Sequence, residues 1–401
     1  SRCACDPVTR ELASQGVCPF GVMLRFCARF CALLALGFAI GIGYLSIQEH
    51  PMGIVFKTVF TVQGYVKGAT PTPPVKDMKP LPRPSGEILL DLQGSASKMP
   101  ANGLGMCCRP TAYDPVSVER TVLWYLLQGG RHIDTASVYL NHVAIGKAIQ
   151  EAVSLGIPRA EIFLVTKIFM DDFGYHETLN KYQKMLADLQ LEYTDLVLIH
   201  MPIKASPTLF LNYYWKKLVG GADMSVDTVS SQPEQVQFRA ETWRALSELR
   251  AKGLIKNVGV SNFNIKLLQE IENLKLAPIA ANQVQYHPWA PEWMHEVVKY
   301  CQEKNIVVTA YFSLGGTENK QKTFELDILN KMAAAHKKRP AQVLLRWAVQ
   351  KGIAVIPGTG NPNHMIDNLE IYEFRLSEDD MAVLDGMSSL PVKDNFVFFD
   401  F

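Results

Sequence analysis

Two stretches of the chain, FLVTKI (Phe163–Ile168) and DLVLIH (Asp195–His200), decide the fold class. Each is a short, nearly continuous apolar run, which is typical of a parallel strand buried on both faces. Six more such runs recur along the chain, beginning at Gly103 (GLGMCC), His132 (HIDTA), Asn257 (NVGVSN), Ala281 (ANQVQY), Val307 (VVTAYF) and Ala354 (AVIPG). Helix-period segments separate them. Eight strand–helix units in about 260 residues predict a closed (β/α)8 barrel of the TIM type, an α/β fold.

The helices between these strands have recognisable ends. Asp114-Pro115 predicts the start of one helix, which Gly129-Gly130 ends. Further helices are predicted over Glu241–Lys252 and from Pro340 up to Gly352. A doubly wound sheet is the rival fold, but the first strand is not followed by a complete G-x-G-x-x-G motif.

Before the barrel, EILLDL and SKMP flank Gly94 and predict a short β-hairpin. We expect this hairpin to close the N-terminal mouth of the barrel.

Composition excludes several classes of protein. The chain has 401 residues and a formal net charge of +1, whereas nucleic-acid-binding proteins usually carry a basic excess. Five of the eight cysteines lie in the first 31 residues, so the folded part is not a disulfide scaffold. No pair of cysteines has zinc-ligand spacing with a second matched pair, and no metal site is predicted.

The N-terminal quarter divides into three segments. Residues 1–29 form a cysteine-containing tail, and residues 30–47 (FCALLALGFAIGIGYLSI) carry no charge. This run favours a transmembrane anchor, with a cleaved targeting segment or a buried helix as alternatives. Arg25 and Arg29 would leave the N-terminus in the cytosol. The protein is therefore expected to be a single-pass membrane protein or to be targeted to an organelle.

Residues 48–84 form a linker, because six prolines between Thr70 and Pro84 favour a stiff, extended chain. The barrel is predicted to occupy residues 85–401.

Polar residues stand where the predicted strands end, which is the side on which barrels of this type carry their chemistry. They are Asp134, Lys167, His200, Ser261, Asn262, Gln283 and Tyr311. Asp134 and Lys167 come from neighbouring strands, so their charges can offset each other. Tyr139 follows in the loop after the second strand. We expect the Lys167 ammonium to lower the pKa of Tyr139.

Tyr139 could then exchange a proton with an alcohol or carbonyl oxygen, which His200 could position by hydrogen bonding. The sequence offers no protein nucleophile paired with a base, so a cofactor has to supply any redox chemistry.

The last strand runs into a glycine-rich turn, Gly358-Thr359-Gly360-Asn361-Pro362, which opens a helix containing His364 and Asn368. Free amides at such a turn favour a phosphate. Tyr311, at the end of the seventh strand, could stack on a flat ring. Taken singly, each of these residues has an ordinary structural explanation: a helix cap, a buried core histidine, or a glycine turn between a strand and a helix.

The chain resembles the aldo-keto reductase superfamily from about Gly86 onward. The resemblance rests on GGRHIDTASVYLNHVAIGKAI (Gly129–Ile149), LVTKI (Leu164–Ile168), LVLIHMP (Leu196–Pro202), GVSNF (Gly259–Phe263), NQVQYHP (Asn282–Pro288) and VIPGTGNP (Val355–Pro362). It implies an NAD(P)H-dependent carbonyl reductase whose catalytic tetrad falls on Asp134, Tyr139, Lys167 and His200.

The resemblance also implies further cofactor contacts. Ser261, Asn262 and Gln283 would hold the carboxamide, and Tyr311 would lie under the nicotinamide. Leu314 begins a segment that is short for a clamp over the cofactor.

The family's 2′-phosphate-binding lysine and arginine fall on Gly358 and His364. Thr359, Asn361, His364, Asn368 and the helix amides remain as predicted contacts, with NADP(H) favoured and NAD(H) possible. The two tryptophans of the family's substrate pocket fall on Cys107 and Met201.

These features together predict a reductase that converts a small aldehyde or ketone to an alcohol, with Tyr139 as the proton donor. The alternative is a cofactor-binding regulatory subunit of a membrane protein, similar to channel β-subunits of the superfamily. A third hypothesis is a barrel with an unrelated function. The substrate, the organelle and the oligomeric state stay open.

Overall fold

The structure is a computed structural model that describes residues 75, 77–204, 229–315 and 323–389. All of these lie in the second of two compact units, Phe60–Phe401, and the first is Ser1–Val59. The predicted anchor, residues 30–47, lies outside the described residues. Within the described ranges, no helix combines the length and the apolar character that a membrane crossing requires.

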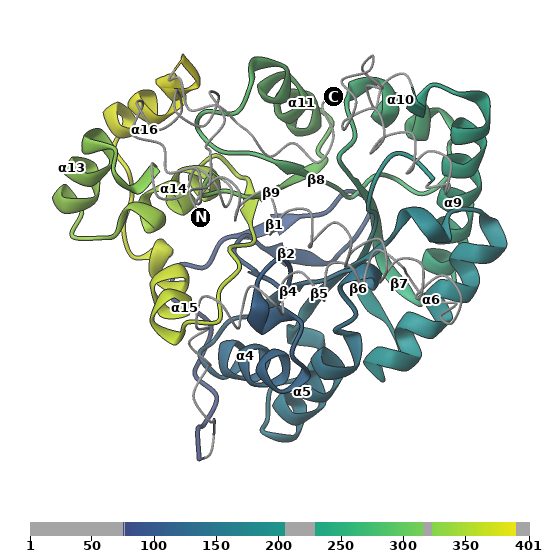
Figure 1. The fold of residues 1–401 in the computed structure, drawn as a ribbon, viewed down its shortest axis with the longest axis horizontal. Coiled ribbons are helices and arrows are strands. Elements are labelled where there is room, and N and C mark those ends of the chain that lie inside the picture. Colours follow the sequence, from purple (N-terminus) through teal and green to yellow (C-terminus); the bar gives the residue numbers. More distant parts are fainter. Residues whose placement is uncertain (1–74, 76, 205–228, 316–322, 390–401) are drawn as a thin grey trace, which may run out of the picture. The chain divides into compact units, whose positions relative to one another are not determined.

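Eight parallel strands form the central sheet, and every run predicted as a strand is one (Figure 1). They are β3 (Leu104–Gly105), β4 (His132–Asp134), β5 (Phe163–Ile168), β6 (Thr194–Ile199), β7 (Ile255–Ser261), β8 (Ala281–Gln285), β9 (Val307–Tyr311) and β10 (Ala354–Val355). Neighbours in sequence are neighbours in the sheet. The amide of Gly103 donates to the Val355 carbonyl at 2.8 Å, and Asn102 bridges Val355, so β3 meets β10 and the barrel closes.

Helices surround this ring of strands. They are α4 (Pro115–Leu127), α5 (His142–Ser154), α6 (Tyr175–Leu189), α9 (Pro233–Ala251), α10 (Ile265–Asn273), α11 (Glu292–Glu303), α13 (Asp327–Ala335), α14 (Pro340–Gln350), α15 (Pro362–Leu369) and α16 (Glu378–Asp385). Short 3-10 turns add η1 (Pro110–Ala112), η2 (Ser137–Tyr139), η3 (Arg159–Glu161), η4 (Met170–Asp172), η5 (Glu370–Tyr372) and η6 (Gly386–Ser389).

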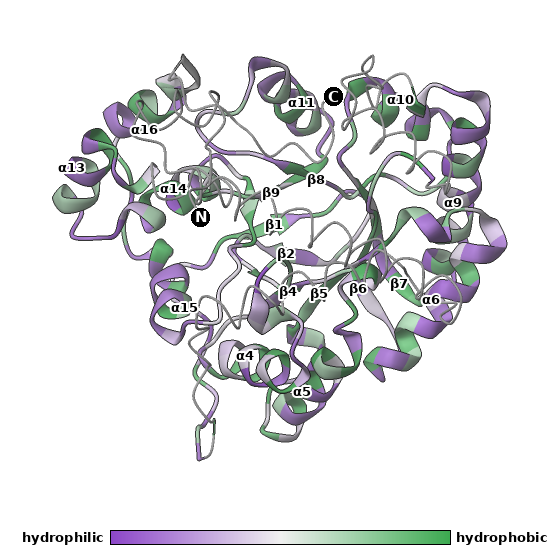
Figure 2. Ribbon diagram, in the orientation of Figure 1, coloured by the Kyte–Doolittle hydropathy of each residue, from purple (hydrophilic) through white to green (hydrophobic). Residues whose placement is uncertain are grey.

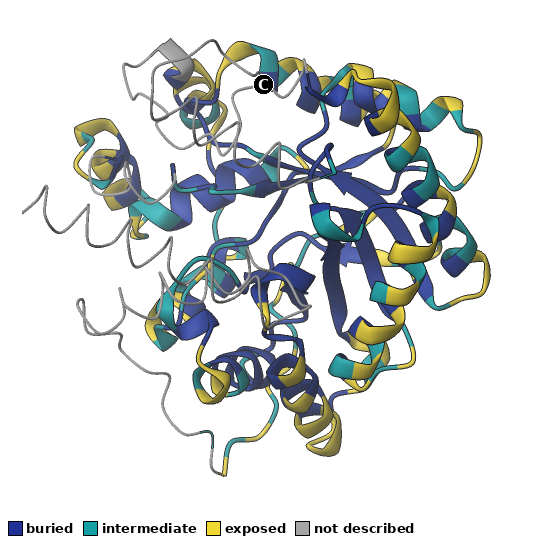
Figure 3. Ribbon diagram, turned by 45° about the vertical axis from the view of Figure 1, so that its right-hand side comes forward, coloured by how far each residue is buried: buried dark blue, intermediate teal, exposed yellow. Residues whose placement is uncertain are grey.

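The helix patterns predicted from sequence hold with one change of boundary. Asp114 caps α4 by accepting from the Ser117 amide at 2.8 Å. Helix α9 begins at Pro233, eight residues before the predicted start at Glu241, and proline occupies its first turn, where the missing amide hydrogen costs no helical bond. The outer faces of the helices are exposed and polar, whereas the strands are buried (Figures 2 and 3).

The predicted hairpin is present as β1 (Leu89–Asp91) paired antiparallel with β2 (Lys98–Pro100). Leu92 and Met99 of this hairpin belong to one apolar cluster with side chains of the barrel strands, Phe163, Val165, Leu196, Leu198, Ala281 and Val307. The hairpin therefore covers the N-terminal mouth of the barrel, as the sequence predicts. An active site is expected at the opposite, C-terminal mouth.

Described residues that precede the predicted boundary at Ser85 also contact the barrel. The Leu81 amide donates to the Leu127 carbonyl at the end of α4, at 2.7 Å, and Val75 and Met78 pack on the α4–α5 cluster. Val75, Met78 and Leu81 of the proline-rich stretch therefore lie against the barrel. Leu81 has the amide that its flanking prolines lack, so it can make this bond.

Candidate active site

The carboxyl ends of three strands bring a buried ion pair together. Lys167 of β5 donates from Nζ to Asp134 Oδ1 of β4 at 2.6 Å and to the Thr135 carbonyl at 2.9 Å. Gln283 of β8 reaches across the barrel and donates to Asp134 Oδ2 at 2.7 Å. The Lys167 side chain is fully buried and that of Asp134 nearly so. Burial lowers the pKa of Lys167, and the Asp134 carboxylate opposes that shift.

Tyr139 stands beside this pair in η2 and faces His200. Its hydroxyl lies 3.5 Å from His200 Nε2, and the two rings meet edge to face. Lys167 Nζ is 5.3 Å from the centre of the Tyr139 ring. The phenol therefore lies over the ammonium while its oxygen points to the imidazole.

The predicted lowering of the Tyr139 pKa is wrong. Burial, with added repulsion from Asp134 and from the nearby Tyr113 and Tyr311, raises this pKa well above its usual value. The physical reason is that the described hydrogen bonds of the Lys167 ammonium go to Asp134 and Thr135 and none goes to the Tyr139 oxygen, so no such bond offsets the loss of water around a phenolate. Tyr139 is therefore a neutral phenol at physiological pH.

His200 is also neutral. Burial holds its pKa well below the usual range, and the Lys167 cation lowers it further. Its Nδ1 atom is buried and makes no hydrogen bond to the described protein groups, while the ring of Phe169 packs edge-on against it. A neutral imidazole with Nε2 directed at the mouth can donate to an oxygen placed between His200 and Tyr139.

The other strand-end residues form one hydrogen-bond network. Tyr311 donates to Asn262 Oδ1 at 2.7 Å, and Asn262 Nδ2 donates to the His200 carbonyl at 3.0 Å. Ser261 Oγ donates to the Gln283 carbonyl at 2.8 Å. Asn262 adopts φ +63°, a left-handed conformation that asparagine tolerates better than most residues. The predicted carboxamide contacts therefore lie together at the mouth, next to His200.

The glycine-rich turn after β10 leads into α15, as predicted. Thr359 Oγ1 accepts from the Asn361 amide at 3.0 Å, and Asn361 caps the helix by accepting from the Asn363 amide at 3.0 Å. His364 lies exposed on the first turn of the helix. Asn368 lies at the far end of α15, where its carbonyl accepts from Asn102 at 2.6 Å.

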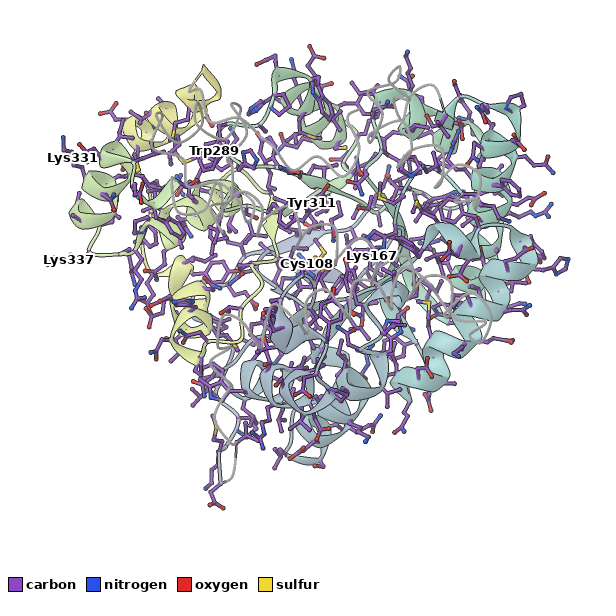
Figure 4. The ribbon with its side chains drawn as sticks, in the orientation of Figure 1. Cys108, Lys167, Trp289, Tyr311, Lys331 and Lys337 are labelled. Carbon is purple, nitrogen blue, oxygen red and sulfur yellow. A yellow bond between two sulfur atoms is a disulfide. The ribbon has the colours of Figure 1, made fainter. Side chains whose placement is uncertain are left out.

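The predicted pocket residues lie around this mouth. Met201 is buried, and its sulfur accepts from Asn262 Nδ2 at 3.2 Å. Cys107 and Cys108, after β3, are joined in a disulfide that no sequence pattern predicted. Because the two cysteines are adjacent, this bond connects no separate elements. In the view of Figure 4, Cys108, Tyr311 and Lys167 are labelled over the ring of strands. Leu314 packs against the main apolar core after β9.

Sequence reasoning missed three residues at this mouth. Tyr113 accepts from the Cys108 amide at 3.4 Å, Phe169 packs on His200, and Arg109 lies against the turn after β10. Only Arg109 left a usable signal, since it is a charged residue that directly follows a strand end.

These features fit a dinucleotide. The mouth has a glycine-rich turn at the start of α15, the amide side chains of Asn262 and Gln283, and an imidazole nitrogen of His200 that has no partner among the described groups. The pieces define a class of protein: a TIM-type barrel that moves a proton at its C-terminal mouth and takes its redox equivalents from a cofactor.

Comparisons with known proteins agree with that class. The model of the Aldo/keto reductase family matches residues 102–389. The chain is 33% identical over 302 residues to aldo-keto reductase family 1 member A1 of Bos taurus, covering 73% of this chain and 87% of the relative. It is 32% identical over 292 residues to the 9,11-endoperoxide prostaglandin H2 reductase of Trypanosoma cruzi (strain CL Brener), covering 73% and 88%.

Solved structures resemble it as well. One is an aldo-keto reductase of Bombyx mori in complex with NADP, with a TM-score of 0.63 and 27% identity, covering 76% of this chain and 92% of that one. Another, an aldo-keto reductase from a deep-sea metagenome library, has a TM-score of 0.63 and 30% identity, covering 78% and 98%. The chain belongs to the aldo/keto reductase family. It is an NAD(P)H-dependent oxidoreductase of the carbonyl-reducing type.

Proposed function

We propose that the protein reduces an aldehyde or ketone to an alcohol, with Tyr139 as the proton donor and His200 as the residue that orients the carbonyl oxygen. The observation that carries these roles is the pair formed by the Tyr139 hydroxyl and His200 Nε2, 3.5 Å apart. Both groups are neutral, since burial raises the pKa of the phenol and lowers that of the imidazole. A neutral phenol is the form that can give a proton to a carbonyl oxygen.

Each neighbouring residue has a part in this arrangement. The Asp134–Lys167 pair sits below the phenol, and its Lys167 cation adds to the burial that keeps the pKa of His200 low and the imidazole unprotonated. Asn262 binds the His200 backbone carbonyl and so fixes the position of the imidazole. When bound, the dihydronicotinamide supplies the hydride that completes the reduction.

The residues proposed to hold the cofactor are those at the mouth and in the last turn. Ser261, Asn262, Gln283 and Tyr311 lie beside the reacting centre. A second group, Leu314, Gly358, Thr359, Asn361, His364 and Asn368, belongs to the segments after β9 and β10. NADP(H) is the favoured cofactor, a choice that the NADP complex of the Bombyx mori relative supports. Fluorescence titration with NADPH and NADH tests this choice, and a clear preference for NADH would overturn it.

Tyr139→Phe tests the proton donor. The change removes only a hydroxyl whose described hydrogen-bond partner is 3.5 Å away, so the fold should persist. Carbonyl reduction should fall by about 10²- to 10⁴-fold, the usual contribution of a general acid. Affinity for the cofactor should stay unchanged. Retention of most of the turnover would show that Tyr139 is not the donor.

The alternative of a cofactor-binding regulatory subunit is not favoured, because the curated relatives reported above include a protein named as a reductase. Steady-state turnover with a panel of small carbonyl compounds, followed by cofactor absorbance, separates the two. Tight cofactor binding without turnover would favour the regulator.

We also propose that the uncharged run at residues 30–47 anchors the protein in a membrane or directs it to an organelle. Its eighteen residues without a charge, preceded by Arg25 and Arg29, support this proposal. Fractionation of cells that express the full chain, followed by protease treatment of intact vesicles, tests it. Recovery of the intact chain in the supernatant would argue against an anchor.

A further inference from the structure

The seam where the barrel closes brings two loops together. The Gly105 amide of β3 donates to the Pro357 carbonyl at 3.4 Å, so the chain after β3 runs beside the turn after β10. A Cβ atom at Gly358 would lie 2.9 Å from Arg109 Nη1, and one at Gly360 would lie 2.6 Å from Thr111 Oγ1. Both glycines are therefore needed for the close approach of this turn to Arg109 and its neighbours.

Arg109 holds its guanidinium in place with neutral groups alone. Its Nη1 donates to the Gly105 carbonyl at 2.5 Å and to the Cys107 carbonyl at 3.4 Å. Its Nε donates to Thr111 Oγ1 at 3.2 Å, and its Nη2 approaches Met106 Sδ at 3.2 Å. Across the described ranges no carboxylate forms an ion pair with it. Its acceptors carry only partial charges, so among the residues that the structure describes its positive charge has no anion.

The guanidinium nevertheless stays charged. Burial lowers the pKa of Arg109 to about 10, and the nearby Tyr113 opposes that shift, so the side chain is cationic at neutral pH. A partly buried cation without an anion is costly, and an anion bound beside it would recover that cost. The turn that it touches, Gly358–Asn361, has no lysine or arginine of its own.

We propose that Arg109 binds a phosphate group of the nicotinamide dinucleotide at the seam between β3 and β10. This inference rests on the proposed function. The planar fork of a guanidinium suits phosphate oxygens, and the Nη2 atom, whose described contact is a weakly accepting thioether, is the donor that phosphate would recruit. The positive charge for the phosphate then comes from the loop after β3, while the turn after β10 contributes glycines that make room for the Arg109 side chain.

Binding of dinucleotides to the full chain tests the proposal. Fluorescence titrations with NADPH and with NADH compare the unchanged protein with Arg109→Gln, Arg109→Lys and the control Arg120→Gln. Arg120 is exposed on α4, so its replacement removes the same charge from the same chain. Arg109→Gln should raise the Kd by about tenfold to a hundredfold, the value of a hydrogen bond to a charged group. It should also make the Kd less dependent on salt. Arg109→Lys should lose less affinity than Arg109→Gln, because lysine keeps the charge but not the planar fork, and Arg120→Gln should change nothing.

The two dinucleotides identify which phosphate is bound. A weaker affinity for NADPH alone assigns Arg109 to the 2′-phosphate, and an equal loss with NADH assigns it to the diphosphate. A Kd for Arg109→Gln within about twofold of the unchanged protein, with both dinucleotides, would overturn the proposal. An equal loss in Arg109→Lys and Arg109→Gln would also overturn it, because a role in holding the loop would then explain both.

A second measurement needs no variant. Phenylglyoxal modifies accessible arginines, and peptide mass spectrometry reports Arg109 and Arg120 separately. NADP⁺ is used here because NADPH could be consumed by reduction of the reagent. Saturating NADP⁺ should protect Arg109 and leave Arg120 reactive, and an unprotected Arg109 would refute the proposal. If the unchanged chain binds neither dinucleotide, the proposed function fails; if it binds both and Arg109→Gln binds equally well, only this inference fails.

Discussion

Replacing Lys167 with methionine should cause a large loss of stability. Lys167 Nζ gives Asp134 its 2.6 Å ion pair, and both side chains are shielded from water. Methionine has a similar volume, so the main consequence is a buried carboxylate whose described hydrogen bond comes from Gln283. Removing one partner of a buried pair costs about 3–5 kcal/mol. In a domain of this size the melting temperature should fall by about 6–20 °C.

The double variant Lys167→Met with Asp134→Asn sharpens this test. Once both charges are gone, no charge is left unpaired, so the double variant should be less destabilised than the sum of the two single variants, by up to about 3 kcal/mol. Urea unfolding of the full chain, followed by circular dichroism, measures all three. Lys252→Met is the control, because Lys252 pairs with Glu248 on an exposed helix face and its loss should be hardly measurable. Additive single variants, or a loss no larger than that of the control, would refute the reasoning.

Three further predictions follow from burial and close packing. His200 stays neutral in the folded protein while an unfolded histidine titrates near pH 6.5, so below that pH the unfolded chain binds more protons. As the pH is lowered below about 6.5, the free energy of unfolding should then fall by up to about 1.4 kcal/mol per pH unit. Urea titrations should show a shallower pH dependence in His200→Gln, and an unchanged pH dependence would show that His200 is not its cause. The raised pKa of Tyr139 predicts that kcat/KM for carbonyl reduction stays level up to about pH 9, so a decline centred near pH 8 in rate profiles would count against it as donor. A Cβ at Gly146 would lie 2.3 Å from the Leu189 carbonyl, so Gly146→Ala should cost about 1–3 kcal/mol in urea unfolding, whereas Gly386→Ala, with open space around it, should cost far less.

The sequence was sufficient for the barrel and for the composition of its mouth. Buried parallel strands must be apolar on both faces, so runs such as FLVTKI can be recognised as strands before their neighbours in the sheet are known. The side on which polar residues gather also follows from topology, because parallel strands carry their carboxyl ends to one mouth. Asp134 and Lys167 could therefore be paired from their strand positions, and the 2.6 Å contact confirms that pairing.

Tertiary structure alone decided how those residues behave. The direction in which the Tyr139 pKa shifts depends on how much water the packed barrel removes and on where Lys167 directs its ammonium. Neither can be predicted from the residues next to Tyr139 in the sequence. The approach of Arg109 to Gly358 is of the same kind. These residues are 249 positions apart, and only closure of β3 on β10 brings them together. Local sequence determines which segments become strands, because that depends on near neighbours along the chain. Desolvation and long-range contact depend on the whole fold, so charge and proton affinity at the mouth had to come from the structure.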